Sequence, residues 1–242
     1  SLLDYIRKTN VASREAGGIT QSIGAYEIEH QGKRITFIDT PGHEAFSKMR
    51  SRGATAADLA VLVVAAEEGV KPQTKESIDI LKATNTPFVV AITKADKPGA
   101  DIEKVKSELM AAGVLLEGYG GQVSFQPVSS KSGEHIDDLL NLILLTAEME
   151  NLTYDPDAPA SGYILETAMD RQRGLHATLI VKNGTLRFGD AIATASTAGK
   201  VKILEDFLGK AAKEITPSAP ALVVGFESMP TVGEEFVVGG AT

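Results

Sequence analysis

The chain has 242 residues and a formal net charge of −8 at pH 7, with 43% hydrophobic and 23% charged residues. It contains no cysteine, which excludes disulfides and thiolate chemistry. The acidic balance means that any contact with nucleic acid must use a local patch. The longest apolar run, residues 59–66, is too short to cross a bilayer, and no secretory leader is visible at the start. We therefore expect a cytoplasmic, globular protein with one large or two modest domains.

Strand-like and helix-like patterns alternate along the first 150 residues. Strand-like runs are predicted at 25–30, 35–38, 59–65, 88–93 and 123–128. Helical patterns are predicted at 45–52, 73–84, 101–112 and 136–150. This alternation predicts an α/β fold in which a mostly parallel sheet has helices on both faces.

The composition changes at residues 153–162, where Asp, Pro, Ala and Gly replace the helical pattern. Beyond them, short strand-like runs are predicted at 163–168, 176–182, 191–195, 200–204, 221–226 and 235–238. Asn183-Gly184 between two of these runs is a strong hairpin signal. We predict a first domain over 1–152, a linker over 153–162 and a small antiparallel β-barrel over 163–242.

The segment Asp39-Thr40-Pro41-Gly42-His43 follows the strand-like run 35–38. An acid at the end of a strand, with a glycine in the turn after it, suits a sensor of magnesium and phosphate. Asp39 can hold a metal-bound water, and the backbone N–H of Gly42 can face a terminal phosphate because no side chain blocks the approach. His43 is placed to orient an attacking water, although such a histidine is often only a surface residue. We assign the whole segment to nucleotide binding.

Thr93-Lys94-Ala95-Asp96 lies at the end of the strand-like run 88–93. The Asp96 carboxylate can accept hydrogen bonds from N1–H and the 2-amino group of guanine. The Lys94 stem can cover the base or the ribose. An ordinary polar exit from a strand would produce the same pattern, so the motif by itself leaves both interpretations open.

Ser129-Ser130-Lys131 follows the next strand-like run, 123–128. Its backbone N–H groups can reach the carbonyl of guanine, although the tripeptide alone is typical of many loops. Its position adds to its value, because the carboxyl ends of parallel strands meet at one edge, where such folds bind ligands. We therefore expect these residues at the same edge of the sheet as Asp96.

The segment 17–20 lies upstream of the first strand-like run and ends in Thr20. Thr20 offers a hydroxyl for magnesium, and the two glycines before it allow a loop to change shape. A flexible loop without a metal is the alternative interpretation.

Several segments together are similar to one family. They are residues 14–21, 39–46, 49–54 and 71–74 in the first half, and 173–174, 182–186 and 189–190 in the second. These segments closely resemble bacterial translation initiation factor 2, and the resemblance covers nearly the whole chain. It implies that the first part is a GTPase domain and that the second is the barrel domain that follows it, similar to the second domain of elongation factor Tu.

The resemblance implies a ribosome-dependent GTPase that promotes initiator tRNA binding and subunit joining, with GTP or GDP and Mg²⁺ as cofactors. It implies that Thr20 and Asp39 lie around magnesium and that Gly42 lies at the terminal phosphate. It also implies that His43 positions the attacking water once the large ribosomal subunit is engaged.

The same resemblance assigns guanine recognition to Lys94 and Asp96. Thr93 stands where the family usually has Asn. The threonine has a hydroxyl but lacks the amide donor of asparagine. Ser22 stands where the family is expected to have His. We therefore expect a modest loss of nucleotide affinity from Thr93 and assign no role to Ser22.

As partners, the resemblance implies both ribosomal subunits, and initiator tRNA bound through later domains that this chain does not include; it implies no membrane. Two alternatives stay open. One is a non-catalytic adaptor that docks on the ribosome without nucleotide. The other is a different translational GTPase, such as a selenocysteine-specific factor.

A G-x-x-x-x-G-K-[ST] phosphate loop does not occur in the sequence, although the family places this loop directly before residues 1–8. Its strand would lie between 35–38 and 59–65, and a vacant position there would leave backbone groups unpaired. Either 35–38 moves against 59–65 to close the sheet, or another segment fills the position. We expect that the natural protein extends before Ser1, and that this chain binds nucleotide poorly and hydrolyses none.

Overall fold

The computed structural model describes residues 2–10, 24–38 and 56–239. Contacts between residues divide the chain into two units. One comprises the described parts of Ser1–Thr9 and Ala57–Leu152, and the other those of Asn10–Ala56 and Thr153–Thr242. The hairpin at 25–38 thus belongs to the second unit, whereas the sequence-based domain boundaries place it in the first.

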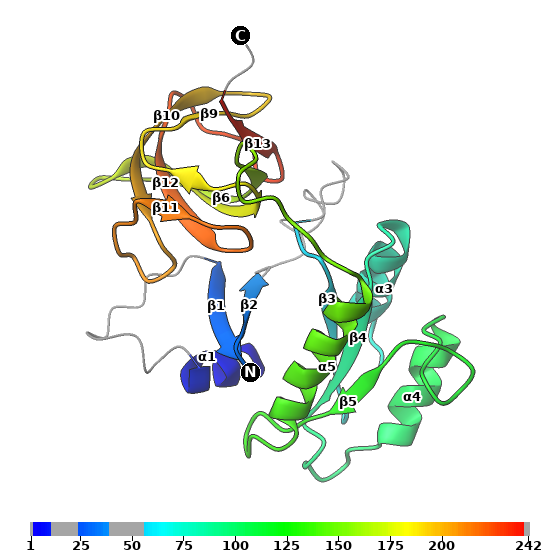
Figure 1. The fold of residues 1–242 in the computed structure, drawn as a ribbon. Helices are drawn as coiled ribbons and strands as arrows, with labels where there is room; N and C mark the ends of the chain where they lie inside the picture. The colour runs from blue at the N-terminus through cyan, green and yellow to red at the C-terminus, as the bar shows by residue number, and fades with distance from the viewer. Residues whose placement is uncertain (1, 11–23, 39–55, 240–242) are drawn as a thin grey trace. The chain divides into compact units, whose positions relative to one another are not determined.

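The first unit contains a three-stranded parallel sheet in the order β3-β4-β5. Its strands are β3 (Ala60–Ala65), β4 (Phe88–Thr93) and β5 (Phe125–Pro127). Its helices are α1 (Leu2–Asn10), α3 (Pro72–Ala83), α4 (Ile102–Ala111) and α5 (Ile136–Met149) (Figure 1). β3 is apolar throughout and β4 is apolar as far as Ile92, and every residue of β4 from Val89 to Thr93 is buried, as expected of a central strand packed on both faces.

The helices cover both faces of this sheet. Apolar side chains of α3 and α4 pack with Val90 and Ile92 of β4 in one core cluster. Side chains alternate along a strand, so Val89 and Ala91, both buried, face the opposite side. Helix α5 contacts β4 and buries four apolar residues of its own. The sheet is therefore a middle layer between helices, which confirms the predicted α/β class.

The hairpin of β1 (Ala25–His30) and β2 (Lys33–Ile38) forms a separate two-stranded antiparallel sheet. Ala25 packs in a core cluster with Leu165 and Ile180 of the barrel. The Thr36 hydroxyl donates to the carbonyl of Ser218. Within the described residues, residues 35–38 therefore do not close the sheet against β3, because the apolar face of the hairpin is buried within the second unit instead.

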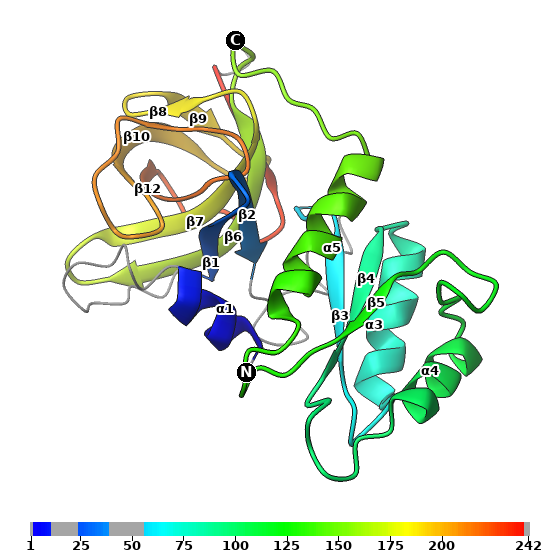
Figure 2. The same cartoon turned by 60° about the horizontal axis from the view of Figure 1, so that its bottom comes forward.

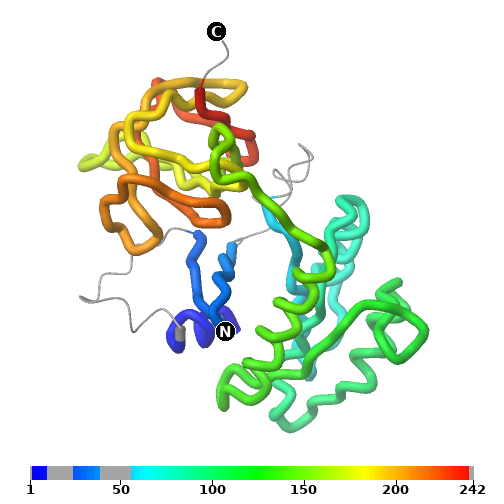
Figure 3. Tube along the Cα trace, viewed as in Figure 1, coloured from blue at the N-terminus to red at the C-terminus, as the bar shows by residue number. Residues whose placement is uncertain are grey.

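The second unit also contains a closed barrel, which Figure 2 shows. Its strand order is β10-β12-β7-β6-β13-β9. Its strands are β6 (Ser161–Asp170), β7 (Gly174–Asn183), β9 (Ala191–Ala193), β10 (Ala198–Glu205), β12 (Pro220–Phe226) and β13 (Glu235–Val238). Two short strands, β8 (Leu186–Arg187) and β11 (Glu214–Ile215), pair beside it. Figure 3 follows this part of the chain to the red C-terminal strand. Phe236 is fully buried in the core, and the predicted antiparallel barrel is confirmed.

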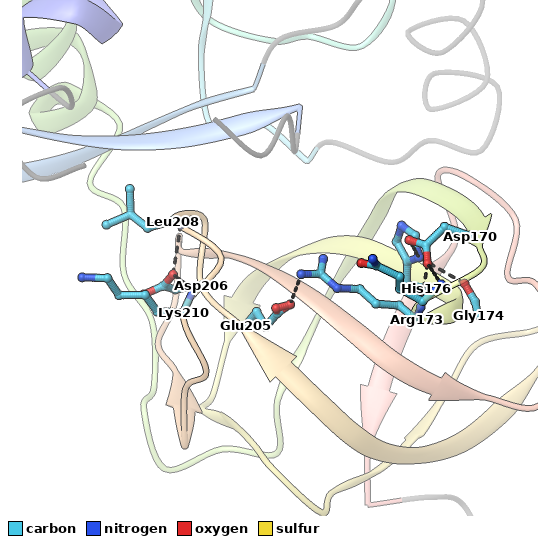
Figure 4. A network of polar contacts seen from close by, with 9 residues as sticks. Asp170, Arg173, Gly174, His176, Glu205, Asp206, Leu208 and Lys210 are labelled. Carbon is cyan, nitrogen blue, oxygen red and sulfur yellow. Dashed lines mark hydrogen bonds and ion pairs between the residues drawn. The ribbon is translucent and has the colours of Figure 1, made fainter. Parts of the chain in front are cut away.

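Charged side chains hold the turn between β6 and β7 (Figure 4). Asp170 Oδ1 accepts hydrogen bonds from the backbone N–H groups of Arg173, at 2.6 Å, and Gln172, at 2.9 Å. These two hydrogen bonds hold the pKa of Asp170 below its usual value, and the bond from Arg173 is the larger cause. The turn presents the Arg173 guanidinium to Glu205 at the end of β10, with Nη2 3.0 Å from Oε1.

Glu205 is buried, with a relative exposure of 7%. Its Oε1 atom has no hydrogen-bond donor with good alignment among the described residues, so the nearby guanidinium is its main compensation. A buried carboxylate that loses its counter-ion costs far more than an exposed one. The pair therefore couples the β6–β7 turn to the end of β10.

We predict that Arg173→Met lowers the free energy of unfolding of the barrel by about 3 kcal/mol, because it leaves the Glu205 carboxylate buried and uncompensated. The double variant Arg173→Met/Glu205→Met should recover much of this loss, since it removes the buried charge as well. Urea denaturation followed by circular dichroism measures both.

Arg187→Met is the matched control. Arg187 pairs with Glu214 at 3.7 Å, but both side chains are more than half exposed, so its loss should stay within about 0.5 kcal/mol. A loss in Arg173→Met no larger than in Arg187→Met, or a double variant less stable than the single one, would contradict this account.

Candidate functional site

The three parallel strands of the first unit end at a common edge. Ala65 pairs with Thr93, and Ile92 pairs with Pro127. The hydrogen bonding continues past the strand ends, with Ala66 N–H donating to Thr93 O at 2.8 Å and Ala95 N–H donating to Val128 O at 3.3 Å. The structure thus brings the predicted 93–96 and 129–131 segments to one edge of the sheet.

The 93–96 segment forms a tight turn. Thr93 is buried, whereas Asp96 is exposed and has no partner among the described residues. Lys94 has φ +56°, a left-handed conformation that non-glycine residues rarely adopt. Lys97 N–H closes the turn by donating to Lys94 O at 3.1 Å. Strained backbone of this kind persists where the surrounding structure fixes it, and it concentrates at binding sites.

The 129–131 segment offers fewer free donors than its sequence indicates. The Ser129 N–H donates to the carbonyl of Glu134 at 3.0 Å, and the Ser129 carbonyl accepts from Gly133 at 2.8 Å. Ser129 Oγ also accepts from the N–H of Ser132 at 3.3 Å. Ser129 is therefore a structural residue of the loop. Within the described residues, the N–H groups left for a ligand are those of Ser130 and Lys131.

A carboxylate that the sequence analysis did not single out lies at the same edge. Glu67 follows β3, and its Oε1 accepts a hydrogen bond from Lys94 Nζ at 3.1 Å. Lys97 Nζ lies 3.8 Å from the same oxygen. The hydrogen bond from Lys94 is the main cause that holds the pKa of Glu67 below its usual value. The signal available in the sequence was positional, since Glu67 comes two residues after the predicted strand 59–65, at an exit where ligands bind.

The other predicted site residues lie outside the described residues. They are Thr20, Asp39, Thr40, Pro41, Gly42 and His43. Within residues 2–10, 24–38 and 56–239, no group of three or more His, Asp or Glu side chains is placed to hold a metal ion. The predicted magnesium and phosphate contacts therefore stay predictions.

His135 is the last residue before α5 and sits beside the 129–134 loop. Its backbone is left-handed, with φ +63°. Its Nδ1 lies 2.8 Å from Asp138 Oδ2, and its Nε2 lies 3.4 Å from Glu134 Oε1. The bond to Asp138 is the main cause that raises the pKa of His135 above its usual value of 6.5. The imidazole thus links the loop to the first turn of α5.

No helix in the described parts of the chain is long and apolar enough to span a membrane.

Two family models match the sequence. The model described as the elongation factor Tu GTP binding domain matches residues 6–149, and the model described as elongation factor G domain 2 matches residues 159–239.

Curated relatives named translation initiation factor IF-2 match nearly all of the chain. The factor from Rubrobacter xylanophilus is 51% identical over 98% of this chain and 34% of its own length. The factor from Nitratiruptor is 52% identical over 98% of this chain and 28% of its own length. The predicted resemblance is confirmed, and the chain spans about a third of the length of these relatives.

Solved structures of translational GTPases share the fold. The GDP-bound aIF5B from Aeropyrum pernix matches with a TM-score of 0.79 and 26% identity, over 99% of this chain and 52% of that one. The apo form of elongation factor SelB from Methanococcus maripaludis matches with a TM-score of 0.72 and 25% identity, over 98% of this chain and 52% of that one.

We predict that His135 stabilises the first unit more in mild acid than in mild base. Its pKa is raised in the folded state, so its contribution is fully present below 6.5 and disappears as the pH rises through the folded pKa. His135→Asn tolerates the left-handed backbone but removes the charge. The melting temperature of the wild type should exceed that of His135→Asn by more at pH 5.5 than at pH 8.5.

Asp138→Asn serves as the control, because it removes the main cause of the raised pKa and should flatten the pH dependence. Scanning calorimetry at the two pH values provides the comparison. A difference between wild type and His135→Asn that stays constant or grows toward pH 8.5 would refute the prediction.

Proposed function

We propose that the exits of β3, β4 and β5 form the guanine-binding side of a GTP site. The reason is that this chain belongs to the family of the elongation factor Tu GTP-binding domain. The observation that carries the proposal is the meeting of the 93–96 turn and the 129–131 loop at one edge of a parallel sheet. Ligands bind at this edge in open α/β sheets.

The chemistry of this edge suits guanine. The exposed Asp96 carboxylate accepts from N1–H and the 2-amino group of the base, a donor pair that adenine lacks. The N–H groups of Ser130 and Lys131 face the carbonyl oxygen of guanine, a role that the sequence analysis also gave to Ser129. The Lys94 stem covers the base or ribose, and the buried Thr93 begins the turn at the end of β4.

The magnesium and phosphate contacts of the proposed site rest on the sequence. Thr20 and Asp39 supply a hydroxyl and a carboxylate, the oxygen ligands that Mg²⁺ prefers. The 39–43 segment supplies the N–H of Gly42 for the terminal phosphate. His43 orients the attacking water for hydrolysis of GTP in the whole protein.

The relatives named IF-2 support a role in bacterial translation initiation for the whole protein. We propose that it is a cytoplasmic GTP hydrolase that acts on both ribosomal subunits. It then promotes initiator tRNA binding through its other domains. The similarity to IF-2 relatives is about twice as high in sequence identity as that to SelB, which favours initiation over selenocysteine incorporation.

We predict that the chain distinguishes bases through Asp96. Millimolar GDP should shift the backbone amide resonances of Lys94 to Asp96 in the nuclear magnetic resonance spectrum, and ADP should not. Asp96→Asn should lower the affinity for GDP by about tenfold or more, because it removes a charged acceptor. The same variant should gain affinity for xanthosine diphosphate, whose 2-oxo group accepts from the new amide.

Asp137→Asn makes the same change of charge on the first turn of α5 and should leave both affinities unchanged. Equal shifts with GDP and ADP in the wild type would overturn the guanine site. So would an Asp96→Asn variant that keeps the preference for GDP over xanthosine diphosphate.

We also predict that the 242-residue chain binds GDP more weakly than micromolar and hydrolyses no GTP. The sequence has no phosphate loop, and each charge-assisted contact that this loop would make is worth about 1.5–3 kcal/mol. Isothermal calorimetry checks the affinity, and phosphate release checks the hydrolysis. Micromolar or tighter binding of GDP would show that other residues replace the loop.

A further inference from the structure

Glu67 projects from a turn that the rest of the first unit holds in place. The N–H groups of Glu68 and Gly69 both donate to Ala65 O, at 3.1 and 2.9 Å. Glu108 Oε2 of α4 accepts from the N–H of Val70 at 2.7 Å. The turn is thus tied to β3 on one side and to α4 on the other. A side chain carried by such a turn has a fixed starting point.

Lys94 starts from an equally fixed point on the neighbouring strand. Its backbone is held in the left-handed region, and the next residue donates to the loop after β5. From there its ammonium reaches across to Glu67, with Nζ 3.1 Å from Oε1. The backbone of Lys94 is thus fixed at the exit of β4, and its ammonium is bound to Glu67 after β3. Its four-carbon stem therefore runs between the two strand exits.

We propose that Glu67 is a positioning residue that holds the Lys94 side chain stretched along the exits of β3 and β4, where its stem covers the base of a guanosine nucleotide. This inference rests on the proposed function for the identity of the ligand, a guanosine nucleotide. The contact between Glu67 and Lys94 does not depend on it. Neither the sequence pattern nor the family match assigns a role to Glu67.

The consequence for binding is pre-organisation. A free lysine side chain samples many rotamers, and ordering it when the ligand arrives reduces the affinity. Glu67 orders the stem before the base arrives. The contact also occupies the Lys94 ammonium, so the stem rather than the charge meets the ligand.

The chain offers a close control for this role. Glu68 is the next residue on the same turn, and its carboxylate pairs with Lys71 at 3.4 Å instead of Lys94. Glu67→Gln and Glu68→Gln therefore make the same change of charge one residue apart. Only Glu67→Gln removes the carboxylate that lies against Lys94.

The first measurement needs no nucleotide. Carbon-13 relaxation of the Lys94 ε-methylene reports how far the side chain is ordered. We expect an ordered methylene in the wild type and in Glu68→Gln, and a mobile one in Glu67→Gln. A Lys94 side chain that is equally ordered, or equally mobile, in all three proteins overturns the proposal.

The second measurement is the affinity for GDP, from amide shifts during titration. Glu67→Gln should weaken binding about three- to tenfold, the range expected when one long side chain must be ordered on binding, and Glu68→Gln should not. In a Lys94→Met background, Glu67→Gln should have no further effect, because Glu67 acts through Lys94.

The outcomes separate the two proposals. A wild type that does not prefer GDP to ADP removes the proposed function, and the order of Lys94 alone then decides whether Glu67 holds it. A wild type that prefers GDP, with Glu67→Gln binding as tightly or more tightly, keeps the function and overturns the positioning role. Loss of affinity by Glu67→Gln in the Lys94→Met background also overturns it.

Discussion

Backbone hydrogen bonds that continue beyond the ends of β3, β4 and β5 are the constraint on which the candidate site depends. The bond from Ala66 N–H to Thr93 O joins the first two exits, and the bond from Val128 N–H to Ile92 O, also 2.8 Å long, joins the last two. Parallel pairing points all three exits toward one edge. The backbone pairing therefore brings side chains from three distant parts of the sequence to one edge of the sheet. The chemistry at the edge then depends on which residue follows each strand.

The β1–β2 hairpin shows that an amphipathic strand pair goes where its apolar face is best buried. Ile28 is fully buried and Ala25 nearly so, and the hairpin packs within the barrel unit. Within the described residues, β3 pairs only with β4, and Val63 on β3 is half exposed. An apolar strand with one unpaired edge is a recognised liability in soluble proteins. The hairpin's apolar face is thus covered by the barrel, while one edge of β3 has no strand paired to it among residues 2–10, 24–38 and 56–239.

Strong local periodicity explains how much of the fold could be predicted. The run 88–93 became β4 without change, and the pattern at 73–84 became α3 at Pro72–Ala83. β5 is shorter than its pattern, because only Phe125–Pro127 finds a pairing partner in β4. The contacts of the site could not be predicted where they depend on how the loops fold back on themselves. The Ser129 N–H is occupied by Glu134, and Glu67 meets a lysine 27 positions later in the sequence. Neither contact leaves a periodic signal.

Charge at this edge favours the recognition of a neutral base over that of a phosphate. Two lysines, Lys94 and Lys97, lie within 3.8 Å of one carboxylate oxygen of Glu67. Their positive charge is thereby partly compensated before any ligand arrives, and Asp96 adds an uncompensated negative charge beside them. A phosphate placed here would meet that carboxylate and two occupied ammonium groups, which is unfavourable at short range. A purine with donor groups meets a free acceptor instead. In the proposed site, the phosphates of the nucleotide would therefore have their counter-charges away from these strand exits.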